Sequence, residues 1–556
     1  MKSYAQLLTF FFFFSFFLSN AQRKRKQKKV TQQSVVVTAP KLIVGIIVDQ
    51  MRYDYLTRFS NHYGEGGFKR LEKQGFSAKN HHFNYAPTST GPGHASVYTG
   101  TTPSEHGIIS NNWYDIETNN SIYCVDDNKY NSIGTTSDAG KVSPDHLLTT
   151  TITDQLRLHT QMRGKTIAIA LKDRAAVLPG GHTANAAYWF DGDDIGKWIT
   201  SSYYMNALPK WVQAFNNSGK IQEYKKTWST LKDITTYIES GVDNNAYEGL
   251  FETETAPVFP HNPPNLLDKT KDFDIIRATP WGNSLTTDFA LEALENENLG
   301  SDTDTDFLAI SYSSTDYIGH KFGVNSKEIQ DAYLRLDLEI ERLLNTLDTK
   351  VGIGQYTVFL TADHGAINVP AYLKNNKIPA GYLNEEETKT KLNEFLTYTY
   401  GTTDLVKNIS NNQIFLNRKV IANLDMNLVE VQEEIALELL EYTNINKVYT
   451  GNQMWQNEYN KGIPYLLQNG WHQKRSGDIL LVPEPAYISY SKTGSTHGSP
   501  MIYDTHVPLL FYGNGIKKGS TYNKTEIPDI APTIAVLLGI AFPNGTTGEP
   551  ISAVLE

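Results

Sequence analysis

The stretch from Lys41 to Gln50 reads KLIVGIIVDQ, an almost unbroken run of aliphatic, mostly β-branched residues that ends at Asp49. Such a run is typical of a central strand that is buried on both faces of a parallel sheet. Similar runs recur along the chain at Lys165–Arg174, Thr305–Asp316, Tyr356–Gly365 and Val507–Gly513. We therefore predict that these segments form the strands of a buried sheet.

Stretches with helical periodicity separate these strand runs. They lie at Gly67–Gln74, Thr149–His159, Ser284–Asn296, Lys327–Leu347 and Pro528–Leu538. Strands that alternate with helices predict an α/β fold, specifically a three-layer α/β/α sandwich with a mostly parallel central sheet. Ligands of such sheets bind beyond the carboxyl ends of the strands, so we expect the functional residues there.

Two segments interrupt the alternation, and we expect both to be insertions that cap the site. The first, at about 179–280, is rich in Trp, Tyr, Asn and Pro. The second, at about 370–480, shows a different order of expected elements: a helix at 385–400, strands at 405–408 and 413–416, a helix at 428–442 and a strand at 446–450. That order resembles part of a ferredoxin-like α+β unit.

The N-terminal residues predict export. Residues 1–21 contain Lys2, an apolar run from Leu7 to Leu18 and small residues at a cleavage position, which is typical of a signal peptide. Residues 22–39 include the basic run RKRKQKK and are interpreted as a disordered tail, and the main domain spans 40–556. We expect a periplasmic protein in a Gram-negative host, or otherwise a secreted one, without stable membrane insertion.

Composition excludes several other classes. The net charge is −10 and no basic stripe follows the N-terminal run, so we expect no nucleic-acid partner. Cys124 is the only cysteine, which rules out an internal disulfide. The fold must be stabilised by a large core or by metal, and we expect a monomer.

Candidate metal ligands gather at the expected edge of the sheet. Three aspartates close strand runs, and three histidines lie beside them or in the Gly- and Ser-rich loop GSTHGSP: Asp49, Asp316, Asp363, His320, His364 and His497. Any one such aspartate is commonly a helix cap or turn residue. Mixed carboxylate and imidazole donors, however, suit zinc, or else manganese or cobalt, better than calcium, and six ligands suffice for a two-metal site.

A run of hydroxyl residues in APTSTGPGHASVYTG, residues 86–100, offers a nucleophile. Two metals about 4 Å apart can hold the attacking and leaving oxygens of a displacement at phosphorus. Thr90 precedes Gly91-Pro92-Gly93 and a helical run, so it is placed at a helix N-terminus, which favours an anion. Taken alone, Thr90 fits a helix N-cap equally well, and Ser89 and Thr88 are alternative nucleophiles.

With these residues in this order, the chain resembles the alkaline phosphatase superfamily, and most closely the exported bacterial alkaline phosphatases that use a threonine nucleophile, the PafA-like group. The resemblance covers residues 41 to about 548. It is also carried by five further motifs: TGTTPSEHGI at 99–108, NNWYD at 111–115, TADHG at 361–365, GWHQKRSGDI at 470–479 and PDIAPTIAVLLGI at 528–540.

The resemblance implies a division of the ligands and a mechanism. One zinc would be bound by Asp316, His320 and His497. The other would be bound by Asp49, Asp363 and His364 together with Thr90, whose attack on a phosphoryl group would give a phosphothreonine. Asn111 would hydrogen-bond a non-bridging oxygen. No further carboxylate set argues for a third, magnesium site, which leaves magnesium open.

Lys172 and Arg174, in the motif LKDR, favour phosphate monoesters as substrates. A monoester dianion concentrates charge on the non-bridging oxygens, where paired cations act. The pair resembles the Lys-x-Arg feature of the monoesterase group, although taken alone the two residues fit a solvated surface pair at a strand end better. Two alternatives stay open: a nucleotide pyrophosphatase/phosphodiesterase whose aromatic insertion stacks a base, and a catalytically inactive zinc-binding surface protein. A sulfatase is disfavoured, because no C/S-x-P-x-R motif surrounds Thr90.

Overall fold

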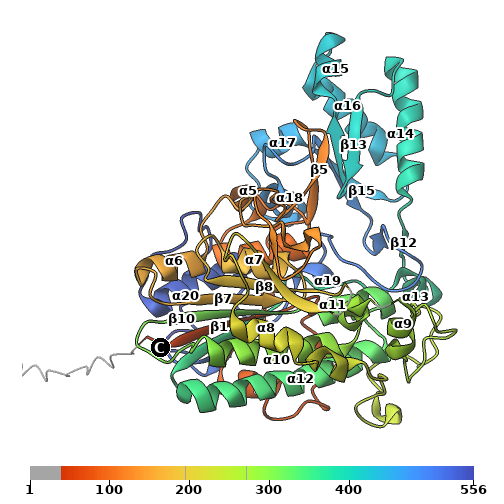
Figure 1. Cartoon of the computed structure of the whole chain (residues 1–556). Helices are drawn as coiled ribbons and strands as arrows, with labels where there is room; N and C mark the ends of the chain where they lie inside the picture. The colour runs from red at the N-terminus through yellow and green to blue at the C-terminus, as the bar shows by residue number, and fades with distance from the viewer. Residues whose placement is uncertain (1–38, 194–195, 271) are drawn as a thin grey trace, which may run out of the picture. The chain divides into compact units, whose positions relative to one another are not determined.

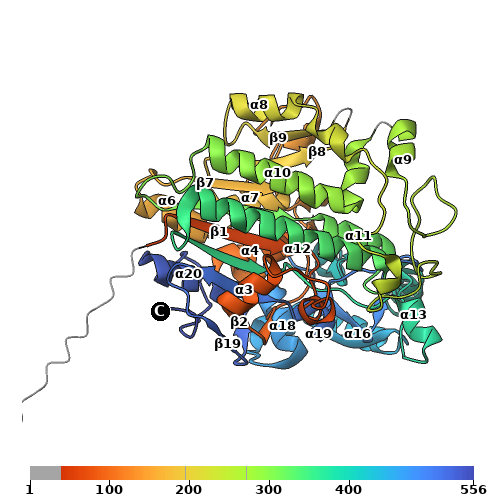
Figure 2. The same cartoon turned by 90° about the horizontal axis from the view of Figure 1, so that it is seen from below.

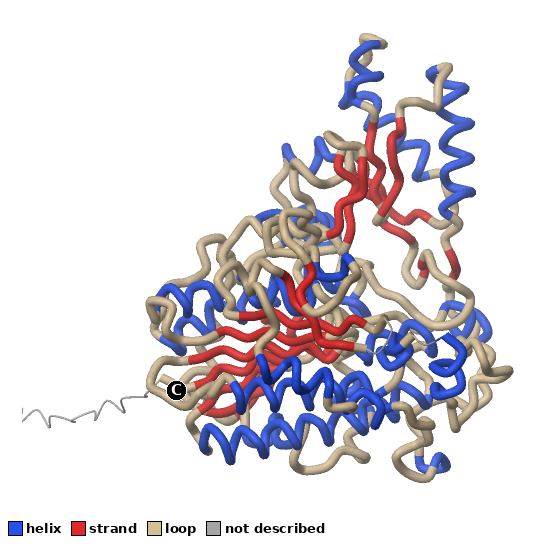
Figure 3. The backbone as a smooth tube through the Cα atoms, in the orientation of Figure 1, coloured by secondary structure: helices blue, strands red, loops and turns tan. Residues whose placement is uncertain are grey.

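A computed structural model describes residues 39–193, 196–270 and 272–556. In these residues the main sheet has ten strands (Figures 1 and 3), in the order β19 (Gly519–Thr521), β2 (Phe76–Ala78), β18 (Leu509–Gly513), β11 (Tyr356–Thr361), β1 (Leu42–Val48), β10 (Asp306–Tyr312), β7 (Thr166–Ala170), β8 (Ala186–Asp191), β9 (Lys197–Ser201) and β6 (Ser132–Ile133). The five from β11 to β8 run parallel, whereas β18 and β9 pair with them antiparallel. The predicted α/β class with a mostly parallel sheet is confirmed.

Strand β1 is the centre of this sheet, as its sequence predicted. It pairs with β10 on one side, with Val48 opposite Tyr312, and with β11 on the other, with Ile47 opposite Thr361. All of its residues are buried. Because β1, β10 and β11 are parallel neighbours in register, the residues that follow them emerge at one edge of the sheet.

Helices cover both faces of the sheet (Figures 1 and 2). One face carries α10 (Pro280–Asn296) and α12 (Lys327–Leu347), and the other carries α4 (Thr90–Thr99), α6 (Ile152–His159), α7 (Arg174–Gly180) and α20 (Ile530–Leu538). The helix predicted from Ser284 begins earlier, because Pro280 occupies its first turn after Thr279 as N-cap. Shorter helices include α2 (Tyr55–Arg58), α3 (Phe68–Gln74), α5 (Pro103–His106), α8 (Lys210–Asn217), α9 (Pro263–Thr270), α11 (Ser314–Phe322), α13 (Pro370–Asn375) and α19 (Ile502–Thr505).

The segment 179–280, which we expected as a surface insertion, supplies β8 and β9 to the main sheet. Its aromatic side chains fill the core: Tyr188, Trp189 and Trp198 are each at most 2% exposed. Trp198 stacks on Phe289 of α10 with ring centroids 4.3 Å apart. These three rings are therefore structural and cannot stack a nucleotide base, whereas the other three aromatic residues of the phosphodiesterase alternative, Tyr203, Tyr204 and Trp211, are only half-buried.

The segment 370–480 contains the α+β order that the sequence indicated. After α13 and β12 (Gly381–Tyr382), it contains the helices α14 (Glu385–Tyr400), α15 (Arg418–Asn423), α16 (Leu428–Leu440), α17 (Gly451–Gln456) and α18 (Gly462–Gly470), and the strands β13 (Val406–Ser410), β14 (Gln413–Leu416) and β15 (Ile445–Thr450). A later strand, β16 (Ile479–Pro483), completes an antiparallel sheet in the order β13-β14-β16-β15. Strand β16 thus takes the place of the first strand of a ferredoxin-like unit.

Three two-stranded pairs complete the described strands: β3 (His81–His82) with β20 (Thr525–Glu526), β4 (Asn112–Asp115) with β5 (Asn120–Tyr123), and β12 (Gly381–Tyr382) with β17 (Tyr487–Ile488). The predicted signal peptide and nearly all of the predicted basic tail lie outside the described residues. No helix within the described ranges is long and apolar enough to span a membrane.

A buried charged cluster ties the segment before α10 to α12. His261 is fully buried, with Nδ1 3.0 Å from Glu254 Oε2 and Nε2 2.9 Å from Glu328 Oε1 at the start of α12. Although burial opposes the charge, these two glutamates raise the pKa of His261 to about 9. Its ring also packs against Phe322, the last residue of α11.

We predict that the loss of a proton from His261 at alkaline pH lowers the free energy of unfolding. Its folded-state pKa lies above the ordinary value, so its contribution is complete below about pH 6.5 and is lost as the pH rises through about 9. His261→Gln should lower the free energy of unfolding at pH 7 by ~1–3 kcal/mol and flatten its decline between pH 7 and 10. Urea unfolding across that range measures this, with the exposed His159→Gln as control. Equal pH slopes in wild type and His261→Gln would contradict it.

Candidate metal and phosphoryl site

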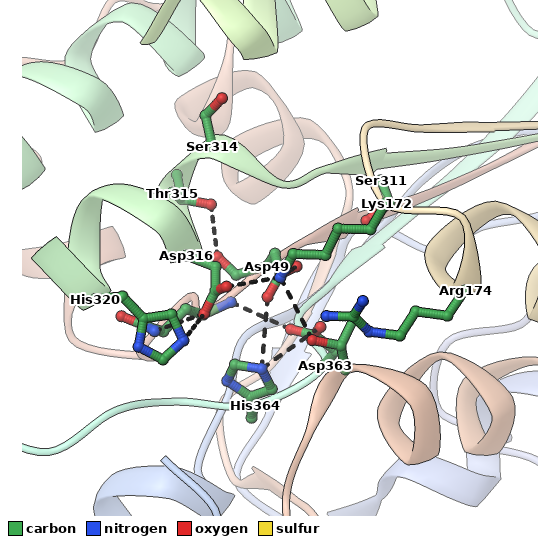
Figure 4. Close-up of polar contacts among 12 residues, drawn as sticks. Asp49, Lys172, Arg174, Ser311, Ser314, Thr315, Asp316, His320, Asp363 and His364 are labelled. Atoms are coloured by element: carbon green, nitrogen blue, oxygen red, sulfur yellow. Dashed lines mark hydrogen bonds and ion pairs between the residues drawn. The ribbon is translucent and has the colours of Figure 1, made fainter. Parts of the chain in front are cut away.

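The three predicted aspartates meet at the carboxyl edge of the sheet (Figure 4). Asp49 follows β1, Asp363 follows β11 and Asp316 lies in the first turn of α11, which follows β10. All three are at most 3% exposed. The register of the parallel strands therefore brings together residues that are far apart in the sequence.

The first ligand cluster forms around Asp316. His320 lies one helical turn further along α11, and its Nε2 is 3.1 Å from Asp316 Oδ1, as the four-residue spacing predicted. His497 approaches from its loop, with Nε2 3.8 Å from the same oxygen. The structure thus brings together the three residues that the resemblance assigned to one metal.

The second cluster forms around His364. Its Nε2 is 3.5 Å from Asp49 Oδ1 and 3.6 Å from Asp363 Oδ2. These three atoms are buried and have no hydrogen-bond partner among the described residues. Buried polar atoms are nearly always satisfied, so three unsatisfied ligand atoms that converge on one another fit a bound cation.

The three histidine rings have the orientation that a metal site would require. Nδ1 of His320 donates to Ser495 O at 2.8 Å, Nδ1 of His497 to Thr88 O at 2.7 Å and Nδ1 of His364 to Gly365 O at 3.0 Å. A carbonyl only accepts, so Nδ1 carries the proton and the Nε2 lone pair faces the carboxylates. Such bonds to the outer nitrogen are the usual support of a metal-binding histidine.

The two clusters are contiguous and meet at Asp316. Ligand atoms of Asp316, His320 and His497 lie within 4.8 Å of one another, and so do those of Asp49, Asp316 and His364. Lys172 Nζ lies between them, 2.6 Å from both Asp49 Oδ2 and Asp316 Oδ2 (Figure 4). The predicted lysine therefore faces the clusters from inside the protein and is not a solvated surface residue.

Burial and mutual repulsion perturb these carboxylates. Burial, and then the charge of Asp316, raise the pKa of Asp49 to about 6. Burial and Asp49 hold the pKa of Asp363 well above its usual range. Asp316 is also buried, but His320 and Lys172 hold its pKa well below the ordinary value. Asp49 and Asp363 therefore have too little positive charge around them to stay ionised at their ordinary pKa. A bound cation would supply that charge.

Thr90 lies beside both clusters as the first residue of α4. Ser89 and not Thr90 is the N-cap of that helix, so the simple capping interpretation of Thr90 is wrong. The Thr90 hydroxyl is 3.5 Å from Lys172 Nζ and is 1% exposed. Of the alternative hydroxyls, Thr88 Oγ1 donates to Ser499 O at 3.3 Å.

Asn111 and Arg174 are held near the start of α4 with free donor groups. Asn111 Oδ1 accepts from Gly91 N at 2.7 Å, which leaves its Nδ2 hydrogens available. Arg174 donates through Nη1 to the Tyr123 hydroxyl at 3.1 Å, while its buried Nε has no hydrogen-bond partner among the described residues. An unpartnered guanidinium N–H in this position suits an anionic oxygen.

The strand predicted at Lys165–Arg174 ends before Lys172 and Arg174. Strand β7 ends at Ala170, so Lys172 lies in the following turn and Arg174 begins α7. The two side chains converge because of that turn and not because a strand continues.

Three supporting residues were missed from the sequence. Tyr123 holds Arg174, and its hydroxyl also donates to Asp173 Oδ1. The ring of Tyr317 lies 5.0 Å from Lys172 Nζ. Gln50 contacts two of the aspartates. Tyr317 and Gln50 are each adjacent to a predicted ligand, which is the only signal that could have pointed to them.

Comparison with known proteins gives the family. Residues 43–507 match the family model described as type I phosphodiesterase / nucleotide pyrophosphatase. The chain belongs to this family, within the alkaline phosphatase superfamily.

Several members of the superfamily resemble this chain over almost its full length. Alkaline phosphatase PafA of Elizabethkingia meningoseptica is 43% identical over 93% of this chain and 95% of PafA. A Myroides odoratus protein named calcium-transporting ATPase is 46% identical, with the same coverage. Alkaline phosphatase PhoV of Synechococcus elongatus is 41% identical over 94% of each chain.

A solved structure agrees with the sequence relatives. The crystal structure of wild-type PafA matches with a TM-score of 0.90 at 43% identity, over 94% of this chain and 100% of that chain. The resemblance to PafA-like members of the alkaline phosphatase superfamily, predicted from the motifs, is thereby confirmed.

Close packing of α4 against Asp363 gives a prediction for this superfamily member. A Cβ at Gly93 would stand 2.4 Å from the carbonyl oxygen of Asp363. Gly93→Ala should therefore push α4 away from Asp363 and lower the free energy of unfolding by ~1–3 kcal/mol, measured by urea denaturation. Gly64→Ala is the control, because its Cβ would meet Asp337 at an ordinary 3.5 Å. Equal stability of Gly93→Ala and wild type would show that α4 is free to shift.

Proposed function

We propose that this chain is an exported, zinc-dependent alkaline phosphatase that hydrolyses phosphate monoesters through a phosphothreonine at Thr90. One observation carries the proposal: the Thr90 hydroxyl lies 3.5 Å from Lys172 Nζ, and Lys172 joins the two ligand clusters through Asp49 and Asp316. A nucleophile, two sets of metal ligands and a cation thus share one buried site. The names of PafA and PhoV support the same activity.

The ligand atoms fit two zinc ions. Asp316, His320 and His497 would hold one, and Asp49, Asp363 and His364 the other, with Thr90 as a further ligand of the second. Zinc in these positions would act as a Lewis acid that lowers the pKa of the Thr90 hydroxyl and offsets the charge of the phosphoryl oxygens. Magnesium is not part of the proposal.

Thr90 carries the covalent step. A bond forms between Thr90 Oγ1 and phosphorus, the ester P–O bond breaks, and the proton that the Thr90 hydroxyl gives up ends on the alcohol that leaves. Water then attacks phosphorus, the bond to Thr90 breaks, and inorganic phosphate leaves with Thr90 restored. The N-terminus of α4 favours the added negative charge, and Asn111, with Oδ1 held by Gly91 N, can donate Nδ2–H to a non-bridging oxygen.

Preference for monoesters is proposed to come from Lys172 and Arg174. A monoester presents a dianionic phosphoryl group, and two cations stabilise it more than the single charge of a diester. Both side chains are pre-oriented: Lys172 by Asp49 and Asp316, and Arg174 by Tyr123. The burial of Tyr188, Trp189 and Trp198 removes much of the surface proposed for base stacking.

The remaining parts of the proposal concern the whole chain. Residues 1–21 would direct export to the periplasm or the exterior, and residues 22–39 would form a disordered tail. The catalytic domain would span 40–556, with the segment at about 370–480 inserted in it and the segment at about 179–280 contributing β8 and β9 to its main sheet. We propose a monomer that acts on small phosphate monoesters and binds no nucleic acid.

The choice of ester is tested by initial rates on zinc-loaded protein with p-nitrophenyl phosphate and bis-p-nitrophenyl phosphate. Lys172→Ala/Arg174→Ala should lower kcat/KM for the monoester by ~10²-fold or more and affect the diester much less, because the lost cations face the extra charge. ATP is a useful third substrate, because one relative is named an ATPase.

Two results would redirect the proposal. Faster turnover of the diester, unchanged in the double variant, would transfer the function to the phosphodiesterase activity for which the family is named. If neither ester is hydrolysed although zinc is bound, the inactive zinc-binding protein is the correct interpretation.

Metal content tests the ligand assignment separately from activity. Wild type should retain two zinc ions per chain after dialysis, whereas His364→Ala and His497→Ala should each lose one, because each removes a nitrogen donor from a different cluster. Elemental analysis measures the ratio, with the exposed His159→Ala as control. Loss of both ions in each variant would mean that the clusters do not bind independently, and full retention in either would remove that histidine from the ligand set.

A further inference from the structure

Gln50 contacts one carboxylate of each ligand cluster. Its backbone N–H donates to Asp363 Oδ1 at 3.1 Å, and its side-chain Nε2 donates to Asp316 Oδ1 at 2.7 Å. Gln50 directly follows Asp49 and is 2% exposed. Gln50, a neutral residue, therefore connects the ends of the neighbouring strands β1, β10 and β11 at the place where the two clusters meet.

The backbone of Gln50 is held in an unfavourable conformation. Its φ is +61°, in the left-handed region that glycine adopts freely and that other residues avoid. The Tyr333 hydroxyl, from α12, donates to its carbonyl oxygen at 3.4 Å. Non-glycine residues persist in this region where the surroundings over-determine them, and such positions cluster at functional sites. Glycine would satisfy the backbone at position 50, so the side chain must supply something that glycine lacks.

Gly319 shows the opposite departure from the usual preference, because it is a glycine inside a helix. It lies in α11 between the ligands Asp316 and His320, and a Cβ there would stand 1.9 Å from Gln50 Oε1. Glycine inside a helix is less favourable than alanine. The chain thus has a glutamine where glycine is favoured and a glycine where alanine is favoured, and the two meet at a single contact.

We propose that Gln50 is a positioning residue that sets the separation of the two metal-binding clusters, and that Gly319 provides the space for its amide. This inference rests on the metal assignment in the proposed function. A neutral donor orients Asp316 and Asp363 without neutralising either of them. It uses Asp363 Oδ1 and leaves Oδ2 directed at His364, whereas a glutamate would add repulsion and a lysine would compete with the metal.

Zinc affinity of the mature chain, measured by competition with a chromophoric chelator, tests the proposal. Gln50→Gly removes the amide and relieves the backbone, and Gly319→Ala displaces the amide without changing Gln50. Each should weaken zinc binding by ~10–100-fold, the usual effect of losing a partner of a metal ligand. Because both changes remove the same interaction, the double variant should bind zinc no more weakly than the single variant with the lower zinc affinity.

Two controls separate positioning from general damage. Lys377 is an exposed residue with an equivalent left-handed backbone, φ +63°. Lys377→Gly relieves the backbone strain there and should leave zinc affinity unchanged. Gln50→Glu keeps the shape and the backbone bond but brings an acceptor to Asp316, and it should also weaken binding. The melting temperature of the metal-free protein should not fall in Gln50→Gly, since strain is removed there.

The outcomes are distinguishable. Weakened binding in Gln50→Gly, Gln50→Glu and Gly319→Ala, with a non-additive double variant, supports the positioning role. Wild-type affinity in Gln50→Gly, together with two bound zinc ions in wild type, would overturn it and leave the proposed function intact. Failure of wild type to bind two zinc ions would overturn both.

Discussion

Three carboxylates buried at the ends of neighbouring strands are the constraint from which the rest of the site follows. Unit charges 4 Å apart repel by about 4 kcal/mol at the effective dielectric of a protein, so Asp49, Asp316 and Asp363 cannot all stay charged without compensation. Lys172 supplies part of it, 2.6 Å from both Asp49 and Asp316. Within the described residues, Asp49 Oδ1, Asp363 Oδ2 and His364 Nε2 have no hydrogen-bond partner, and we propose that a cation there supplies the rest.

The groups around these carboxylates serve the same requirement. Backbone carbonyls hold the Nδ1–H of each ligand histidine and so direct Nε2 inward. Helix α4 packs closely on Asp363 because Gly93 has no side chain, and this places Thr90 beside the clusters. The charge that the proposed metals would supply would also make the Thr90 hydroxyl a usable nucleophile, so the proposed chemistry lies at the edge of the sheet where the fold gathers these groups.

The sequence was informative where the signal is local. Continuous apolar runs located β1, β7, β10, β11 and β18, and an aspartate or histidine at a strand end located residues that the fold brings together at the candidate site. It was uninformative where partners are distant in the chain. Strands β8 and β9 were taken for a surface insertion, since the aromatic residues that bury them against Phe289 show no clear period. Strand β16 joins the sheet of the second segment although α17 and α18 separate it in the chain from β15, the strand beside it. Gln50 and Tyr123 act only through contacts that the fold creates.

The covalent phosphothreonine step is the central claim of the proposed chemistry. Acid quenching of the enzyme during turnover of a phosphate monoester, followed by peptide mass spectrometry, should find one phosphate on the peptide spanning Ala86–Gly100, and fragmentation should place it on Thr90. A phosphate on Ser89 or Thr88 would contradict the assignment of the nucleophile. If turnover is rapid but no phosphopeptide accumulates under any quench condition, and none forms from product phosphate, water attacks the substrate directly and the phosphothreonine mechanism is wrong.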